Sequence, residues 1–210
     1  MPQILVAVLA VCVGVAAWNA DAQLLAPPLQ RPDALVKAVT SEVTEALRHD
    51  LAAGRRTDID QLVEKKILPL FDFERMTSMA VARSWRGASP AQQSSLVAEF
   101  KTLLVRTYSV SLASYRNQEI EYKPLRAAAG DTEVLVMSSV RQPGAQAVTI
   151  DYAMEDTPAG WKVYDVKVAG VSLVITYRET FAAAVRDGGI DGLIETLAAK
   201  NRQAALRLKQ

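Results

Sequence analysis

The sequence predicts an α+β protein in which helices cover one face of a curved, four-stranded antiparallel sheet. Three observations lead to this prediction. Apolar residues recur with a helical period over residues 32–115, the period changes to two over residues 119–169, and an apolar helical segment follows Gly170. A run of strands between two groups of helices is typical of the α+β class, whereas strands and helices alternate along the chain in the α/β class.

Three helices are expected in the first part of the chain. Pro32 suits the first turn of a helix whose apolar stripe recurs every four positions as far as Leu47, and Gly54 ends it. A second helix is expected over residues 58–68. A short third helix follows Asp72, whose side chain can cap its N-terminus.

A capping box begins the longest helix. Ser89 is followed by Pro90 at the first helical position and by Gln92 three residues after the serine. The two side chains of such a box satisfy two unpaired backbone N–H groups reciprocally. We expect this helix to extend to about Tyr115, with Phe100 on its apolar face.

Four strands are expected where polar and apolar residues alternate. They cover residues 119–125, 132–141, 147–156 and 161–169. Pro143-Gly144 and residues 158–160 supply turns, so the sheet is predicted to be antiparallel with one dry face.

The remaining residues predict two further helices and a tail. One helix is expected over residues 171–186, and a final helix follows the break at Gly188-Gly189. Residues 201–210 are expected to form a frayed C-terminal tail.

The first 22 residues have the composition of a secretory signal peptide. Residues 4–17 form an apolar run that is short for a bilayer span, which needs about 20 residues. Ala20-Asp21-Ala22 matches the A-x-A form of a cleavage site. We therefore expect export to the periplasm, cleavage after Ala22, and a single domain over residues 23–200. A buried N-terminal helix and a lipidated Cys12 are the alternatives.

The composition argues against metal, thiol and nucleic-acid chemistry. The net charge is +1, with no block of like charge, and the chain has one histidine and one cysteine. His49 lies in a polar part of the first predicted helix, and no second histidine follows it, so we expect a solvated surface residue. We expect no metal, no cofactor and no nucleic-acid partner.

Carboxylates remain as candidates for catalysis. Asp151 and Asp165 lie on neighbouring predicted strands, and alternation places both on the polar face, which favours a solvated pair. No strand position has an aspartate among apolar neighbours on the same face. We therefore expect no catalytic residue and no enzyme. Small α+β sheets do host enzymes that use one buried aspartate as a base, so an enzyme remains an alternative.

Short motifs in a fixed order resemble one family. They are LFDFERM at residues 70–76, SWR at 84–86, SPAQQ at 89–93, FKTLLVRTY at 100–108, WKVYDV at 161–166, GVSL at 170–173, YR at 177–178 and GIDGLI at 189–194. Over about residues 33–200 the chain resembles the MlaC family of periplasmic phospholipid-binding proteins, also called the toluene-tolerance family.

This resemblance implies an NTF2-like fold with an interior apolar cavity between helices and sheet. It also implies a monomeric periplasmic carrier that buries the acyl chains of a phospholipid. Such a carrier shuttles lipid between an outer-membrane lipoprotein complex and an inner-membrane ABC transporter with a lipid-binding ring protein, and so maintains lipid asymmetry. A hopanoid or other polyisoprenoid lipid is an alternative cargo.

Face and motif together select ten residues that we expect to line the cavity and bind lipid. They are Phe73, Met76, Leu104, Tyr108, Val136, Ile150, Tyr152, Val166, Val171 and Val174. Phe100 and Trp161 are expected to be structural. Arg83 and Arg86 either meet an acidic partner or are simply solvated.

Overall fold

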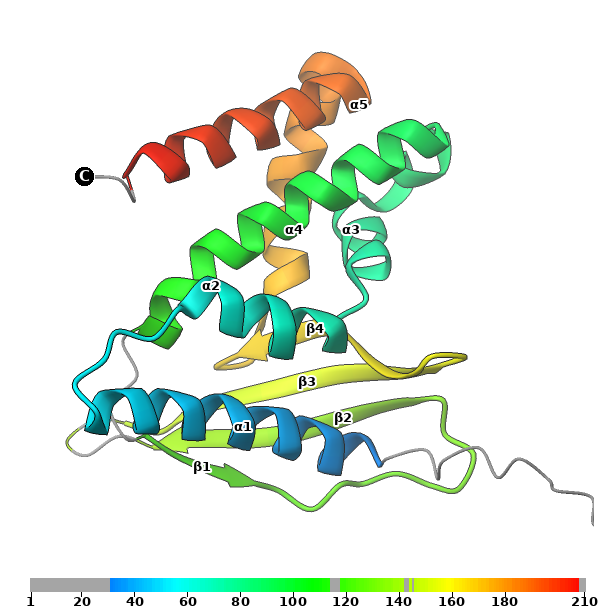
Figure 1. Cartoon of the computed structure of the whole chain (residues 1–210). Coiled ribbons are helices and arrows are strands. Elements are labelled where there is room, and N and C mark those ends of the chain that lie inside the picture. The colour runs from blue at the N-terminus through cyan, green and yellow to red at the C-terminus, as the bar shows by residue number, and fades with distance from the viewer. Residues whose placement is uncertain (1–30, 114–117, 142–143, 145, 208–210) are drawn as a thin grey trace, which may run out of the picture.

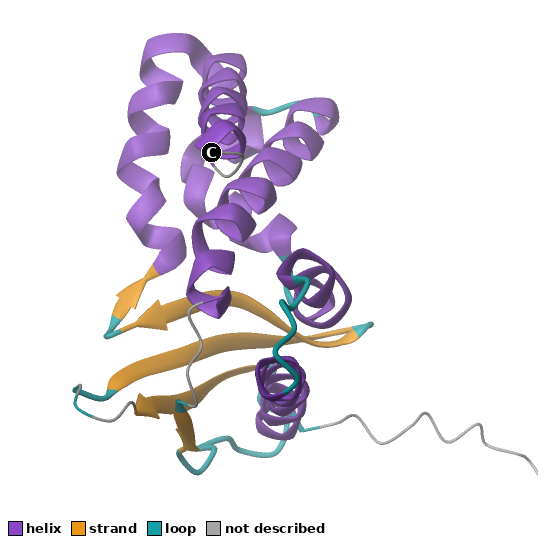
Figure 2. Ribbon diagram, turned by 60° about the vertical axis from the view of Figure 1, so that its left-hand side comes forward, coloured by secondary structure: helices purple, strands orange, loops and turns teal. Residues whose placement is uncertain are grey.

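The computed structural model describes residues 31–113, 118–141, 144 and 146–207, and it places a bundle of helices above one edge of a sheet (Figures 1 and 2). The predicted signal peptide, residues 1–22, lies outside the described residues. The helices precede and follow the strands, as the α+β prediction requires.

The sheet has five strands, one more than predicted. They are β1 (Glu119–Tyr122), β2 (Glu133–Arg141), β3 (Val148–Thr157), β4 (Gly160–Val168) and β5 (Val171–Ser172). The strands follow their order in the sequence, and every neighbouring pair is antiparallel.

The prediction of four strands was wrong at β5. The chain reverses at Ala169 and Gly170, whose φ angles of 50° and 82° allow a tight turn, and two residues then pair with β4. Two residues are too few to show a strand period. Because Val171 and Ser172 lead directly into an apolar helix, the sequence predicted them as the first residues of that helix.

The register aligns side chains of all five strands on one face of the sheet, which we call the inner face. One row of directly opposed residues consists of Tyr122, Ser138, Ile150, Val168 and Val171. The next row consists of Val136, Tyr152 and Val166. Residues opposite one another in a sheet share a face, so these rows form one continuous surface.

The first helices follow the prediction with one difference. They are α1 (Pro32–Ala52), α2 (Ile59–Leu62), α3 (Phe73–Val81) and α4 (Pro90–Ala113). The predicted second helix is α-helical only over α2, and then continues as a π-helical turn (Val63–Ile67) and a 3-10 turn (Leu68–Leu70). A further 3-10 segment, Ala82–Gly87, joins α3 to α4.

Both predicted helix caps are confirmed. The Asp72 carboxylate accepts a hydrogen bond of 2.8 Å from the Arg75 backbone N–H. At the start of α4, Ser89 Oγ accepts from the Gln92 N–H at 3.3 Å, and Gln92 Oε1 accepts from the Ser89 N–H at 2.9 Å. This reciprocal pair is the capping box expected from the sequence.

The last helix, α5 (Leu173–Arg207), is bent where the sequence predicted a break. Gly189 has φ 67°, a left-handed angle that glycine adopts readily, and the two halves run in different directions (Figure 1). Residues 201–207, which we expected to belong to a frayed tail, are helical. Asn201 is buried there, and its Nδ2 donates to the Glu99 carbonyl at 2.9 Å.

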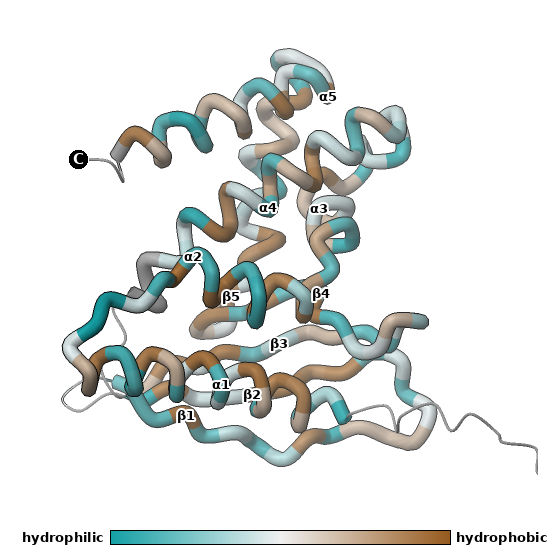
Figure 3. Tube along the Cα trace, in the orientation of Figure 1, coloured by the Kyte–Doolittle hydropathy of each residue, from teal (hydrophilic) through white to brown (hydrophobic). Residues whose placement is uncertain are grey.

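Buried apolar side chains form two groups. The helical cluster consists of Met76, Ala80, Val81, Leu96, Phe100, Leu104, Val174, Phe181, Leu193 and Leu197. The sheet cluster consists of Val36, Leu70, Val134, Val136, Met154, Val163 and Val166. Hydrophobic segments accordingly occur both on the strands and in the helices above them (Figure 3).

The two clusters meet along β4. Phe71 packs against both clusters and forms a parallel bridge with Val163. The backbone N–H of Asp72 donates to the Val163 carbonyl at 2.9 Å. The start of α3 is therefore joined to the sheet through the backbone as well as through side chains.

Arg75 fastens α3 to three strands. Its guanidinium forms ion pairs with Glu133, at 2.6 Å, and with Glu155, and it stacks 3.7 Å from the centre of the Tyr164 ring. The hydrogen bond from Arg75 lowers the pKa of the Glu133 carboxyl.

Asp165 has a structural role that was not predicted from the sequence. It lies on β4 and is 4% exposed, and its Oδ1 accepts a hydrogen bond of 3.2 Å from the Val174 N–H in the first turn of α5. The expected solvated pair with Asp151 was wrong, because α5 begins beside β4 and covers Asp165, while Asp151 lies opposite Lys167. A carboxylate at a helix N-terminus is stabilising.

We expect Asp165→Ala to lower the free energy of unfolding by about 1–2 kcal/mol, because it removes an acceptor for an unpaired N–H of α5. Urea unfolding followed by circular dichroism measures the change. Asp165→Asn is the control, since it keeps an acceptor oxygen and should lose less. An alanine variant as stable as the parent would show that the carboxylate does not cap α5.

Candidate functional site

The ten residues selected from the sequence divide between the two clusters and the surface. Met76, Leu104 and Val174 are buried in the helical cluster, and Phe73 packs against it. In the sheet cluster, Val136 and Val166 are buried, and Ile150 and Tyr152 pack against them. Tyr108 and Val171 are exposed.

The inner face brings half of these residues together. Val136, Tyr152 and Val166 form one row across three strands, and Ile150 and Val171 belong to the neighbouring row. The other five come from α3, α4 and α5, and all of them except Tyr108 belong to the helical cluster or pack against it.

Burial separates the predicted lining into two kinds of residue. Val136 and Val174 are 1% and 0% exposed, so neighbouring protein atoms cover them almost completely. Phe73, Ile150 and Tyr152 keep part of their surface accessible. A side chain that lines an open space keeps accessible surface, so these three residues are better placed than Val136 and Val174 to touch a ligand.

One end of the inner face carries exposed apolar side chains. Val171 is 60% exposed, Ile175 one turn later is 43% exposed, and Val148 at the start of β3 is 41% exposed. Val171 lies opposite Val168, which lies opposite Ile150. The half-buried apolar row therefore ends at an accessible edge of the sheet.

Two tyrosines of the predicted lining hold their protons strongly. Burial, with a hydrogen bond to Tyr177, raises the pKa of Tyr108 to about 12. Burial also raises the pKa of Tyr152, which lies near Tyr122 and Ser138. Both hydroxyls are therefore neutral at physiological pH and act as hydrogen-bonding groups, not as charges.

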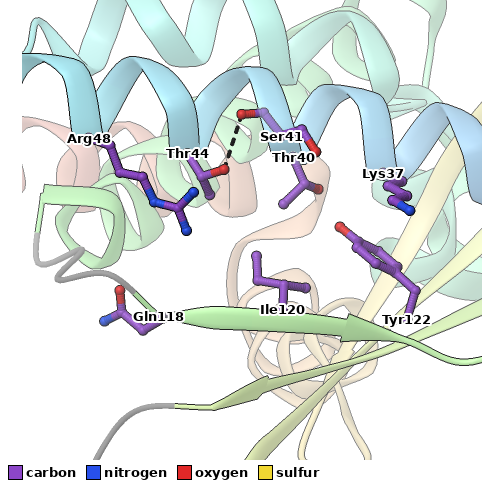
Figure 4. A pocket seen from close by; sticks show the side chains of 8 residues that line it. All are labelled: Lys37, Thr40, Ser41, Thr44, Arg48, Gln118, Ile120 and Tyr122. Carbon is purple, nitrogen blue, oxygen red and sulfur yellow. Dashed lines mark hydrogen bonds between the residues drawn. The ribbon is translucent and has the colours of Figure 1, made fainter.

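A polar groove lies between α1 and β1 (Figure 4). Its volume is about 300 Å³. The lining residues are Lys37, Thr40, Ser41, Thr44, Arg48, Gln118, Ile120 and Tyr122. No signal in the sequence predicted this groove. The helical spacing of the five residues on α1 was available, but nothing local indicated that β1 lies opposite them.

Other candidates from the sequence have ordinary surroundings. His49 is exposed and lies beside Asp50 and Arg55. Arg83 and Arg86 are exposed. Within the described ranges, no group of three or more His, Cys, Asp or Glu side chains is arranged to hold a metal ion. Among those same residues, no helix has the length and apolarity needed to cross a bilayer.

An apolar inner face that adjoins a polar groove suits an amphipathic molecule, so fold and site define a candidate binding protein for such a ligand. Comparison with known proteins gives the family. The chain belongs to the MlaC protein family, which it matches over residues 37–199. The resemblance seen in the sequence motifs is thereby confirmed.

Individual relatives agree with this assignment. The chain is 29% identical to toluene tolerance protein ttg2D of Pseudomonas putida over 192 residues, which cover 87% of this chain and 88% of that protein. It is 24% identical to the intermembrane phospholipid transport system binding protein MlaC of Haemophilus influenzae over 136 residues, 63% of this chain and 64% of that one.

A solved structure extends the similarity to the fold. The phospholipid-binding protein from Ralstonia solanacearum, determined in complex with a phospholipid, is 43% identical and superposes with a TM-score of 0.73. The match covers 82% of this chain and 98% of the Ralstonia chain.

The raised tyrosine pKa values predict a loss of stability at high pH. Unfolded tyrosines ionise near pH 10, whereas folded Tyr108 and Tyr152 keep their protons to higher pH. The unfolded state is therefore favoured as the pH rises from about 10 towards 12, and the full stabilisation is present below pH 10.

Tyr152→Phe should make this fall in stability shallower, because phenylalanine has no proton to lose. Urea unfolding at several pH values between 9 and about 11.5 measures the slope. Tyr108→Phe should act in the same direction but less strongly, since Tyr108 is 37% exposed. Identical slopes for Tyr152→Phe and the parent protein would contradict the burial argument.

Proposed function

We propose that this chain is a periplasmic carrier that binds one phospholipid, with its acyl chains against the inner face of the sheet, and moves it between the two membranes. The observation that carries the proposal is the half-buried apolar row from Ile150 to the exposed Val171, in a member of the MlaC family. The phospholipid in the related Ralstonia solanacearum structure supports the choice of ligand.

An apolar surface of this kind can offset the free-energy cost of moving acyl chains through water. Transfer of a methylene from water to an apolar environment gains about 0.8 kcal/mol, so a tail of about 16 carbons resists leaving a membrane by about 12 kcal/mol. An apolar wall offsets this cost without directional bonds. Release to a partner remains feasible because no strong polar anchor on that wall must be broken.

The predicted lining residues take different roles in this proposal. Phe73, Ile150 and Tyr152 contact acyl chains directly, and Tyr108 and Val171 border the site from the surface. The buried residues Met76, Leu104, Val136, Val166 and Val174 form the wall behind them. Their burial means that uptake of a chain requires the helices to move slightly away from the inner face.

The proposal includes the route of the lipid. Export with cleavage after Ala22 leaves a domain over residues 23–200 in the periplasm. There the carrier exchanges lipid with an outer-membrane lipoprotein complex and an inner-membrane ABC transporter that has a lipid-binding ring protein. The name of the Haemophilus influenzae relative, which describes an intermembrane phospholipid transport system, supports this context.

The enzyme alternative rests on one buried acid. Asp165 is such a residue, but its carboxylate accepts a hydrogen bond from the N-terminus of α5 instead of facing an open site. We therefore assign it to stability and favour the carrier. A hopanoid or another polyisoprenoid remains the alternative cargo, because the apolar row places no demand on the shape of the hydrocarbon.

Mass spectrometry of the purified protein tests the proposal. The chain is exported from cells, purified without detergent, and analysed first under native conditions and then after lipid extraction. We expect about one phospholipid per chain. A bound polyisoprenoid would identify the alternative cargo, and a chain that carries no lipid and acquires none from vesicles would overturn the carrier function.

Val171→Glu should abolish lipid retention and leave the free energy of unfolding near the parent value. The side chain is 60% exposed, so a carboxylate is tolerated there, but it places a charge at the end of the apolar row. Native mass spectrometry measures lipid retention. Leu206→Glu is the matched control, since Leu206 is 64% exposed and lies near the end of α5. Unchanged lipid occupancy in Val171→Glu would contradict this placement of the site.

A further inference from the structure

One group of charged side chains links the helices to the sheet beyond β4. The guanidinium of Arg75, on α3, lies 2.6 Å from Glu133 on β2 and also pairs with Glu155 on β3. It stacks 3.7 Å from the ring centre of Tyr164 on β4, and the Tyr164 hydroxyl donates to Glu133 at 3.3 Å. We call these four side chains the Arg75 clamp. It fixes the position of α3 relative to three strands at once.

α3 is also held firmly to the other helices. Met76 and Ala80 are buried in the helical cluster. Arg178 on α5 donates two hydrogen bonds to the Met79 carbonyl, at 3.2 and 3.0 Å. α3 lies next to α5, above β4 (Figure 1). A movement of the helical cluster away from the sheet therefore moves α3 with it.

The clamp reaches further across the sheet than two backbone links that end on β4. The Asp72 N–H donates to the Val163 carbonyl, and the Val174 N–H donates to Asp165. The carboxylate partners of Arg75 lie on β3 and β2, about 5 and 10 Å beyond β4. Contacts at the boundary between two parts change little when the parts separate slightly, whereas contacts further from it must break.

The helix itself gives no reason for a cation at position 75. Asp72 caps α3, so Arg75 is the third residue of the helix, where a capping box would have Glu or Gln. A cation in the first turn also lies near the positive end of the helix dipole, which is unfavourable. The contacts with the strands, not the helix, therefore account for this arginine.

The clamp neutralises two carboxylates that face each other. Glu133 and Glu155 are directly opposed in the pairing of β2 with β3, and like charges in such positions are destabilising. The hydrogen bond from Arg75 lowers the pKa of Glu133. Lys162 lies opposite Glu155, but its ammonium donates to the Pro69 carbonyl at 2.6 Å. Withdrawal of Arg75 therefore leaves two like charges side by side, which resists opening of the clamp.

The exposure of the clamp suits a contact that opens and closes. The side chains of Arg75 and Glu155 are 28% and 20% exposed, so water and salt screen this pair less than a pair on the open surface. Glu133 is 55% exposed. Opening therefore returns charges to water, whereas a fully buried pair would cost far more to break.

The clamp lies outside the proposed lipid site. Val134 and Met154, which neighbour the two glutamates along their strands, belong to the sheet cluster on the inner face. Because side chains alternate along a strand, Glu133 and Glu155 point to the opposite face. Substitutions in the clamp therefore remove no residue of the proposed lining.

We propose that Arg75 is a positioning residue that sets the rate of lipid exchange, because the clamp must open before the helical cluster and the sheet separate enough to admit or release an acyl chain. The inference rests on the proposed carrier function and adds to it the step that limits the rate. A weakened clamp should speed exchange and a locked clamp should stop it, while the amount of lipid bound at saturation stays the same.

Transfer kinetics test the inference. The chain is loaded with a fluorescent phosphatidylcholine and mixed with vesicles of dioleoylphosphatidylcholine, which have no net charge, and the loss of protein-bound fluorescence is followed. Arg75→Met keeps the aliphatic stem and removes the charge, so we expect it to raise the transfer rate about tenfold, as the loss of charge-assisted hydrogen bonds would give. Arg75→Lys keeps the charge without the planar guanidinium and should have an intermediate rate.

Arg141→Met is the matched control for these rates. It removes a cation that pairs with Glu121 at 2.7 Å within the sheet, between β1 and β2, and should transfer lipid at the parent rate. Sodium chloride at about 1 M should speed the parent and have little effect on Arg75→Met, since salt screens partly exposed ion pairs. A parent-like rate in Arg75→Met would overturn the role of the clamp.

Cross-linking distinguishes a clamp that must open from one that only stabilises the fold. Cys12, the single cysteine of the chain, lies in the predicted signal peptide, so Arg75→Cys and Glu133→Cys would supply the only thiols after cleavage. A reducible bifunctional methanethiosulfonate joins the two thiols. We expect the cross-link to slow transfer at least about tenfold, and reduction to restore the rate.

Glu121→Cys, Arg141→Cys is the control for the cross-link, because it joins two strands and should leave transfer unchanged. If the variant joined between α3 and β2 still transfers lipid as fast as its reduced form, the clamp does not have to open and the inference is wrong. A parent protein that takes up no lipid from vesicles would overturn the carrier function itself.

Discussion

The pairing of β2 with β3 is the constraint on which the inner face depends. It places Val136 opposite Tyr152 and Ser138 opposite Ile150. Because side chains alternate with a period of two, a shift of one residue would turn this whole set towards the other face. The buried Ser138 hydroxyl donates to the Ile150 carbonyl at 2.7 Å, which favours the observed register from the side chain as well as from the backbone.

The strand β4 then fixes where α3 and α5 start relative to the inner face. Its inner side continues the apolar rows of that face. Its other edge pairs with Phe71, which lies just before α3, and with β5, which leads directly into α5. The helical cluster and the sheet cluster meet at this strand instead of merging into one core. Two adjoining clusters can separate slightly at their boundary at a lower cost than a single close-packed interior, whose packing tolerates little change of volume.

The inner face and the groove differ in the forces that they can apply to a ligand. Dispersion contacts and burial along the apolar row are non-directional and grow with the area covered. The polar side chains of the groove, among them Lys37 and Arg48, can form only directional contacts at particular positions. In the proposed carrier, hydrocarbon area therefore supplies most of the affinity.

Local signals in the sequence were sufficient for the α+β order, the capping box at Ser89, the cap at Asp72 and the bend near Gly189, because each depends on residues within a few positions of one another. The order of the short motifs was likewise sufficient to recognise the family. Only the tertiary structure decided the pairing of β5, the burial of Asp165 under α5 and the position of β1 opposite the polar stripe of α1. These features arise from contacts between segments that come together only when the chain folds, and periodicity within one segment contains no information about its neighbour.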